Sequence, residues 1–347
     1  MRWAVVMAGG NGTRFWPLSN PSHPKQFLAL LGAASPAKSC LDRLARVVDR
    51  SRILIVSSTC HRQALAQALP DFPEDQVLWE PAGRNTAPCI AWACETILAR
   101  DPEALIGVFP SDHAISDVEA FAKSLERAFD AAPGRIVLFG IEPTRPETGY
   151  GYIEEGALLS ENLHTVASFL EKPDLETAQS YLAAGRYLWN SGMFIFDART
   201  MHGELTRHVP QIMDIIRGIV DHPETLDTEF KKLLSISIDY AVMEHTDCAV
   251  VMRASFPWDD LGTWDSVSRY FPNDKNENAS HGDVTMLDCH KTFAYAGDAR
   301  PIAVLGLENV IVVSTPDATL VMDASRAQDV RKIVEARQTS RDEKCPD

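Results

Sequence analysis

Three glycines and two cations near the amino terminus have the types and spacing of an anion-binding loop. Gly9, Gly10 and Gly12 follow the apolar run AVVMA, and Arg14 and Lys25 come soon after among prolines and turn-forming residues. Glycines let successive backbone N–H groups face an anion, a guanidinium grips phosphate oxygens through its planar fork, and a lysine adds a compact charge. The loop therefore predicts polyphosphate binding. A tight turn with two solvated cations is the open alternative.

The loop matches neither of two common nucleotide-binding motifs. The pattern GxxxxGK[ST] is missing, and GxGxxG fails because Phe15 stands at the third glycine position. The glycines alone therefore do not decide between a nucleotide site and a turn.

A carboxylate that could bind a metal ion follows a later apolar run. In FPSDH, Asp112 comes directly after Leu105–Phe109, a run that predicts a buried strand. Ligands of doubly wound sheets bind at the carboxyl ends of strands, so Asp112 is a candidate metal ligand. Capping of a helix that begins near Ser116 is an equal alternative. Zinc binding by His113 is not favoured, because no His or Cys lies at ligand spacing.

Strand-length apolar runs alternate with helix-length amphipathic segments over the first two thirds of the chain. The expected buried strands are Trp3–Met7, Arg52–Ser57, Leu105–Phe109 and Arg135–Phe139, and Val118–Ala131 is an expected helix. This βαβ rhythm predicts an α/β fold with a Rossmann-like, doubly wound sheet.

Three further segments interrupt that rhythm. TGYGYIEEG (148–156) predicts a hairpin or an edge strand, and Phe169 and Phe194–Phe196 are expected to begin two more extended segments. The sheet is therefore expected to be mixed.

The pattern of predicted elements changes near residue 280. Short extended pieces follow Gly282, and a helical tail runs from Ser325 to about Gln338. We expect a catalytic domain at 1–275 and a small C-terminal β domain with a terminal helix at 281–340. The run NDKNENAS at 273–280 is a linker or an exposed loop. The tail is too short for its own core, so it should pack on the first domain or on another subunit.

Composition limits the classes of partner and compartment. The formal net charge of -15 predicts no nucleic-acid binding and requires a local cationic pocket or a metal ion for an anionic substrate. The seven cysteines are scattered without a CxxC pair, which is typical of neither a zinc site nor a disulfide framework. No window of about 18 apolar residues is present. We expect a cytoplasmic protein with no membrane association.

Several ordered blocks resemble one enzyme family. GGNGTRFWPLSNPSHPKQFL resembles the signature loop of sugar-nucleotide pyrophosphorylases, and FWPLS and PKQFL are similar to mannose-1-phosphate guanylyltransferases in particular. Further blocks in the family's order are EPAGRNTAP, FPSDH, TGYGYIE, FLEKPD, WNSGMFIF, SIDYAVME and WDDLGTW. The resemblance covers nearly the whole chain. It implies a nucleotide-diphospho-sugar transferase fold and a tail like the start of a left-handed β-helix.

The resemblance implies transfer of GMP from GTP to α-D-mannose 1-phosphate, giving GDP-mannose and pyrophosphate. A phosphate monoester with a second pKa of about 6 is mostly dianionic at neutral pH, so no general base is required. Catalysis should then consist of positioning and charge neutralisation for in-line attack on the α-phosphorus, with Mg²⁺ between carboxylates.

The resemblance also implies roles for particular residues. The catalytic cations are Arg14, Lys25 and Lys172. The metal ligands are Asp112 and Asp260, with Asp259 left open as an alternative to Asp260. The nucleotide-binding residues are Ala8, Gly9, Gly10, Gly12, Thr13, Arg84 and Asn85, and the sugar-binding residues are Gly149, Glu171 and Asn190.

Two other functions stay open from the sequence. One is a pyrophosphorylase for another hexose 1-phosphate or nucleoside triphosphate, and the other is a non-catalytic sugar-nucleotide sensor. Many relatives have a further isomerase domain, and we expect a short form without isomerase activity. A homodimer through the β tail is a further expectation.

Overall fold

The computed structural model describes residues 1–10, 12–20, 22–32 and 34–342, with side chains as far as residue 337. In these residues a mixed sheet has the strand order β3-β2-β1-β4-β8-β5-β9-β7-β6. The strands are β1 (Arg2–Met7), β2 (Ile53–Ser58), β3 (Val77–Glu80), β4 (Leu105–Pro110), β5 (Ile136–Ile141), β6 (Tyr152–Ser160), β7 (Leu163–Leu170), β8 (Tyr187–Asp197) and β9 (Ala249–Arg253). The expected mixed α/β sheet is confirmed.

The order of the strands creates a switch point beside β1. Strands β2 and β3 lie on one side of β1 and β4 lies on the other, and all of these pairs are parallel. Antiparallel β8 then separates β4 from β5. The carboxyl ends of β1 and β4 are therefore neighbours, which is where open α/β sheets bind ligands.

Two sequence expectations need correction here. Phe169 lies near the end of β7, and Phe194–Phe196 lie near the end of β8 rather than at its start. The polar triplet Asn190–Gly192 resembles a break, but it continues β8 past an irregularity opposite Leu138 and Gly140 of β5. TGYGYIEEG leads into β6, which forms a hairpin with β7 at the sheet edge.

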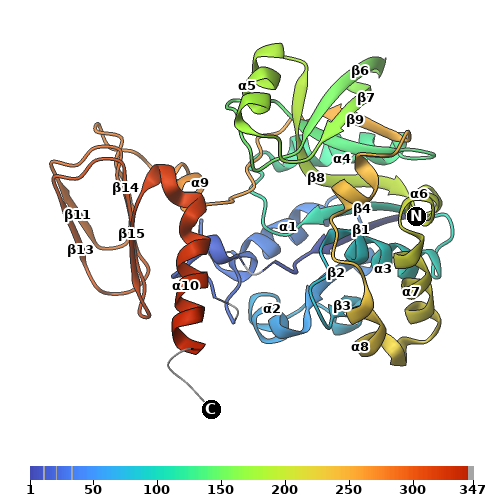
Figure 1. Ribbon diagram of the computed structural model, residues 1–347, viewed down its shortest axis with the longest axis horizontal. Coiled ribbons are helices and arrows are strands. Elements are labelled where there is room, and N and C mark those ends of the chain that lie inside the picture. Colours follow the sequence, from blue (N-terminus) through green and yellow to red (C-terminus); the bar gives the residue numbers. More distant parts are fainter. Residues whose placement is uncertain (11, 21, 33, 343–347) are drawn as a thin grey trace.

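Alternating side chains on β1 point into two cores, one on each face of the sheet. On one face, Trp3 and Val5 pack with α3 (Thr86–Leu98), α6 (Ala198–His208) and α7 (Pro210–Asp221). On the other face, Ala4 and Val6 pack with α1 (Pro36–Leu44), α2 (Arg62–Ala68) and α4 (Val118–Ala131). Helices therefore cover both faces (Figure 1). The other α-helices of this part are α5 (Leu175–Ala184), α8 (Leu226–Glu229) and α9 (Trp264–Ser268).

Short parallel strands stack in the C-terminal part. One sheet has the order β10-β12-β14-β15 and a second pairs β11 with β13. The strands are β10 (Ala279–His281), β11 (Val284–Leu287), β12 (Phe293–Ala296), β13 (Ile302–Leu305), β14 (Val310–Ser314) and β15 (Thr319–Asp323), and the chain continues into η9 (Ala324–Asp329) and α10 (Val330–Asp342). The pairing of β10 with β12 and of β11 with β13 gives successive coils of a β-helix.

One apolar cluster joins this part to the α/β part. Phe15 and Trp264 are fully buried against Phe293, Tyr295 and Val313 of the β-helix strands. Helix α10 stands between the β-helix and the larger sheet (Figure 1) and contacts the 3-10 turn η1 (Thr13–Phe15). The expectation that the tail packs on the first domain is confirmed.

The polar run at 273–280 is an organised turn. Asn278 is buried, and its side chain donates to the Cys289 carbonyl at 2.9 Å and accepts from the Thr292 N–H at 3.0 Å. Asp274 accepts from the backbone N–H groups of Asn276 and Asn278. These bonds tie the run to the first coil of the β-helix.

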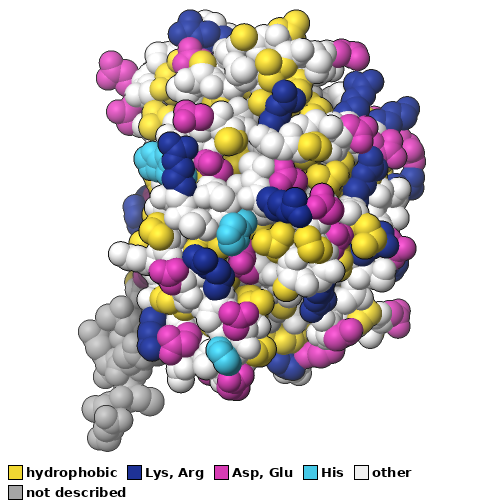
Figure 2. Space-filling view, turned by 90° about the vertical axis from the view of Figure 1, so that its right-hand side faces the viewer, with side chains coloured by type: hydrophobic (Ala, Val, Ile, Leu, Met, Phe, Trp, Pro, Cys, Tyr) yellow, Lys and Arg dark blue, Asp and Glu magenta, His cyan; other side chains and the backbone are white. Residues whose placement is uncertain are grey.

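Cations and carboxylates alternate on the surface. The face in Figure 2 shows Lys and Arg side chains interspersed with Asp and Glu side chains. Among the described residues, no helix is long and apolar enough to cross a membrane.

Candidate active site

A cavity of about 340 Å³ lies at the switch point between β1 and β4. Parallel pairing places Met7 opposite Pro110, so the glycine loop after β1 and the Ser111–Asp112 segment after β4 lie side by side. Glu80 ends β3 nearby. The cavity is lined by the predicted residues Gly9, Gly10, Gly12, Lys25, Arg84, Asn85 and Asp112.

The glycine loop is shaped by close contacts beneath it. Gly12 has a φ of 59°, and a β-carbon there would lie 2.8 Å from the Lys25 β-carbon. A β-carbon on Gly9 would lie 3.1 Å from Glu80 Oε2. The buried Gln26 amide donates to the carbonyls of Ala8 and Gly10, both at 2.9 Å. Gly9 and Gly12 therefore leave little room for a larger side chain.

Two predicted nucleotide-binding residues do not line this cavity. Ala8 is buried, its N–H donates to the Val56 carbonyl, and its carbonyl accepts from Gln26 and Ser57. Its backbone groups are thus already paired within the protein. Thr13 begins η1 outside the cavity lining.

Lys25 and Asp112 form the ion pair at the base of the cavity. Lys25 Nζ lies 2.7 Å from Asp112 Oδ2, and the Lys25 side chain is only 11% exposed. Burial raises the pKa of Asp112, but Lys25, His113 and a backbone hydrogen bond together outweigh burial, so the pKa lies below its ordinary value. Asp117 caps α4 by accepting from Ala120 N–H. The capping alternative for Asp112 is therefore wrong.

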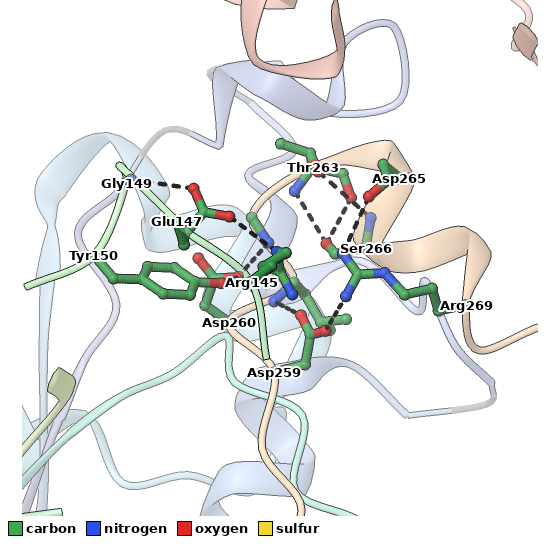
Figure 3. A network of polar contacts seen from close by, with 12 residues as sticks. Arg145, Glu147, Gly149, Tyr150, Asp259, Asp260, Thr263, Asp265, Ser266 and Arg269 are labelled. Carbon is green, nitrogen blue, oxygen red and sulfur yellow. Dashed lines mark hydrogen bonds and ion pairs between the residues drawn. The ribbon is translucent and has the colours of Figure 1, made fainter. Parts of the chain in front are cut away.

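The neighbouring carboxylates Asp259 and Asp260 point in different directions (Figure 3). Asp260 Oδ1 accepts from the Tyr150 hydroxyl at 2.7 Å and from Gly262 N–H at 3.0 Å, and it lines a second cavity. Asp259 accepts from Leu261 N–H at 2.8 Å and lies 3.5 Å from Arg269. Lys25 Nζ donates to the Asp260 carbonyl at 3.3 Å. It thus lies between the Asp112 carboxylate and the Asp260 backbone.

The second cavity, which we call the junction cavity, lies between the α/β part and the β-helix. Its volume is about 330 Å³. The predicted site residues Arg14, Gly149 and Asp260 line it. Arg14 is exposed, and no described residue accepts a hydrogen bond from it or forms an ion pair with it. The predicted cations of one loop thus face two adjacent cavities.

Two of the three predicted sugar-binding residues, Glu171 and Asn190, form a third group with Lys172, whereas Gly149 lines the junction cavity. Lys172 Nζ lies 2.6 Å from Glu171 Oε1, and Asn190 Nδ2 donates to Asp239 Oδ1 at 2.9 Å. Burial, and then the nearby Glu171 carboxylate, raise the pKa of Asp239 to about 6. Tyr150 joins this group to Asp260, because its carbonyl accepts from Lys172 N–H and its hydroxyl donates to Asp260.

The sequence indicated the segment 80–86 for base binding but did not single out two carboxylates in these groups, buried Glu80 and half-buried Asp239. Glu80 is only 6% exposed and lines the nucleotide cavity, and its carboxylate has no hydrogen-bond partner among the described residues. Burial raises its pKa to about 7. Asp239 stands in the quoted block SIDYAVME, and Glu80 opens EPAGRNTAP, so their positions in these blocks were the available signal.

His113 is a buried, neutral neighbour of the site. Burial lowers its pKa to about 4, and its Nδ1 accepts from Trp258 Nε1 at 3.1 Å. Within the described ranges, no group of three or more His, Cys, Asp or Glu residues is arranged to hold a metal ion.

Comparison with known families defines the class. Residues 3–277 match the family described as nucleotidyl transferase, and residues 282–336 match the family described as mannoseP isomerase/GMP-like beta-helix domain. The chain therefore belongs to the nucleotidyl transferase family, with a β-helix-like C-terminal part.

Individual relatives narrow this class. The xanthan biosynthesis protein XanB of Xanthomonas campestris pv. campestris is 43% identical over 341 residues, which cover 95% of this chain and 72% of that protein. Mannose-1-phosphate guanylyltransferase RfbM of Salmonella typhimurium is 41% identical over 344 residues, which cover 95% of this chain and 71% of that protein. A crystal structure from Thermus thermophilus, described as a mannose-1-phosphate geranyltransferase, has a TM-score of 0.89 at 33% identity. The match covers 97% of this chain and 99% of that one. The resemblance to mannose-1-phosphate guanylyltransferases is thus confirmed.

Proposed function

We propose that this protein transfers GMP from GTP to α-D-mannose 1-phosphate, giving GDP-mannose and pyrophosphate. The observation that supports this most directly is the meeting of three separate sequence blocks in one cleft. The glycine loop, Asp112 and the EPAGRNTAP segment line one cavity, and relatives at about this similarity are named mannose-1-phosphate guanylyltransferases.

Glu80 and Asn85 supply the groups that guanine needs. The Watson–Crick edge of guanine has the N1–H and N2 amino donors and the O6 acceptor. A carboxylate accepts two hydrogen bonds and an amide both donates and accepts. Glu80 and Asn85 line the same cavity as Gly9. The unpartnered Glu80 carboxylate would accept from the two guanine donors.

The reaction is an in-line displacement. A phosphate oxygen of mannose 1-phosphate attacks the α-phosphorus of GTP, a new P–O bond forms, and the bond from the α-phosphorus to the bridging oxygen breaks as pyrophosphate leaves. The attacking dianion needs no deprotonation. Lys25 and Arg14 would neutralise the triphosphate, Lys172 the sugar phosphate, and Glu171 and Asn190 would hold sugar hydroxyls.

Asp112 and Asp260 would hold Mg²⁺. Enzymes of this family generally use a divalent metal. The donor set fits Mg²⁺, which takes one or two carboxylates and completes its shell with phosphate oxygens and water. When bound, the ion supplies charge neutralisation between the two anionic reactants.

A substrate panel tests the proposal. Pyrophosphate release is measured with each pairing of GTP, ATP, UTP or dTTP with mannose 1-phosphate or glucose 1-phosphate. We expect release with GTP and mannose 1-phosphate at a kcat/KM well above all other pairs. Preference for another pair would make the protein a different pyrophosphorylase, and binding without release in every pair would make it a sensor.

A further inference from the structure

The junction cavity has walls from both parts of the chain. The α/β part contributes three arginines, and the β-helix part contributes Asn309, Ser325 and Gln328. The arginines are Arg14, Arg145 and Arg269. Nothing in the reaction described above uses Arg145, Arg269 or the C-terminal side chains.

We propose that Gln328 of the C-terminal part and Arg145 of the α/β part are further binding residues for the β- and γ-phosphoryl groups of the nucleotide, and for pyrophosphate in the reverse direction, in the junction cavity. This inference rests on the proposed function and adds residues to the same site.

The direction of the glycine loop supports this location. Gly12 lines the nucleotide cavity, and Arg14, two residues later, lines the junction cavity. Lys25 lines the nucleotide cavity, and its Nζ donates to the backbone carbonyl of Asp260, a residue that lines the junction cavity. A triphosphate that starts with its base near Gly9 and extends along the loop therefore ends in the junction cavity.

The guanidinium groups have donors left for an anion. The guanidinium carbon of Arg145 lies 5.2 Å from the centroid of the Trp189 ring. Among the described residues, only Glu147 accepts a hydrogen bond from Arg145, donated by Nε at 3.2 Å. A guanidinium has five N–H donors in a fixed fork, so the other nitrogens of Arg145 stay available. Arg269 is held by Asp265 at 3.1 Å and by Asp259 at 3.5 Å (Figure 3).

Charge balance indicates the form of the anion. The cavity lining has the three arginines and three carboxylates, Glu147, Asp260 and Asp265. A bare anion would be repelled by the carboxylates, whereas a polyphosphate that arrives with a divalent cation presents charges of both signs. The lining therefore suits a metal–polyphosphate complex.

The Gln328 side chain is free to take part. Gln328 is exposed on η9, and no described residue forms a hydrogen bond with its amide. Ser325 Oγ donates to Asp323 Oδ1 at 2.7 Å, so its hydroxyl hydrogen is already used and Ser325 forms only part of the cavity wall. An amide N–H aimed at a phosphoryl oxygen is a charge-assisted hydrogen bond, which is stronger than a neutral one.

Except for Gly149, which lines the junction cavity, the residues proposed for the sugar phosphate lie outside both cavities. Glu171, Lys172 and Asn190 line neither the nucleotide cavity nor the junction cavity. Variants at Gln328 should therefore change the binding of pyrophosphate and GTP but not that of mannose 1-phosphate.

The test compares Gln328→Ala and Arg145→Ala with Gln67→Ala, a matched change at an exposed glutamine on α2. Binding of pyrophosphate with Mg²⁺ is measured by isothermal titration, which needs no turnover. We expect each of the first two variants to weaken pyrophosphate binding on the order of tenfold. GDP-mannose affinity and the thermal unfolding midpoint should stay at wild-type values, as in Gln67→Ala.

Kinetics separate a binding role from a structural one. The KM for GTP, and for pyrophosphate in the reverse reaction, should rise in Gln328→Ala while the KM for mannose 1-phosphate stays constant. Unchanged pyrophosphate affinity in both variants, or equal weakening of pyrophosphate and GDP-mannose, would overturn the inference. If no substrate pair turns over but pyrophosphate binding still falls in both variants, the proposed function fails and this site stands.

Discussion

At the scale of single residues, the site is defined by charges that are buried next to one another. Lys25 lies between the Asp112 carboxylate and the Asp260 backbone. Glu80 is buried and Asp239 is half-buried, and their pKa values are raised to about 7 and about 6. Carboxylates with raised pKa values are typical of functional clefts. A raised pKa has measurable effects on stability and on ligand binding.

Asp112→Asn tests the metal role of Asp112. The change keeps the size of the side chain but removes its charge, so kcat should fall roughly 100-fold or more. Asp117→Asn is a matched control, because Asp117 caps α4 and does not line the nucleotide cavity. Because Asn caps helices about as well as Asp, this change should leave both the free energy of unfolding and kcat close to their wild-type values. Wild-type turnover in Asp112→Asn would remove the aspartate from the mechanism.

Glu80 should link stability to pH. Because burial raises its pKa from 4.5 to about 7 in the folded protein, the folded state holds a proton that the unfolded state releases between these pH values. Its contribution to stability is thus present below about pH 4.5 and is lost as the pH rises through about 7. Denaturant unfolding should show wild type losing stability relative to Glu80→Gln from about pH 5 to about pH 8. Parallel curves would contradict the raised pKa.

Glu80 should also make nucleotide binding release protons. The guanine donors favour the carboxylate over the carboxylic acid, so GTP binding slightly below the pKa of about 7 should release protons from wild type and not from Glu80→Gln. Titration calorimetry in two buffers with different ionisation enthalpies measures this number. Equal proton release in both proteins would exclude Glu80 from the base site. Glu80→Gln should also discriminate less between GTP and ITP, which lacks the N2 amino group.

At the scale of elements, the glycine loop depends on the C-terminal part for its support. Turn η1 contacts α10, and Phe15 packs on Trp264 at a centroid distance of 5.4 Å. Trp264 also contacts Tyr295 of β12 at a centroid distance of 5.3 Å and donates to the Trp16 carbonyl at 3.2 Å. The block WDDLGTW thus supplies both a carboxylate for the site and the aromatic ring that joins the two parts.

Trp264→Ala tests this joint. Trp264 is fully buried, and removing a buried aromatic ring costs about 3–5 kcal/mol. Chemical denaturation should therefore show a drop of that size in the free energy of unfolding. Leu158→Ala, at a leucine that is 66% exposed, should change stability by less than about 0.5 kcal/mol. Equal effects of the two variants would show that the parts do not support each other.

At the scale of the whole molecule, the sequence predicted the architecture better than the arrangement of the site. The βαβ rhythm was sufficient for the strands next to β1, since buried parallel strands are continuous apolar runs. The same rhythm did not predict the start of β8, because Asn190–Gly192 interrupt the apolar pattern although the strand continues through them. Spacing did not show that Arg14 and Gly12 face different cavities, because this depends on how the β-helix packs on the loop. The unpartnered state of Glu80 likewise depends on burial by α3 and the loop.

The central claim is that the nucleotide cavity, the junction cavity and the group around Lys172 together align two anionic reactants beside Lys25. A crystal structure with GDP-mannose and Mg²⁺ measures this most directly. We expect guanine against Glu80 and Asn85, the diphosphate beside Lys25 and Asp112, and mannose toward Glu171 and Asn190. A nucleotide bound away from the glycine loop, or a mannose pointing away from Glu171, would contradict the account.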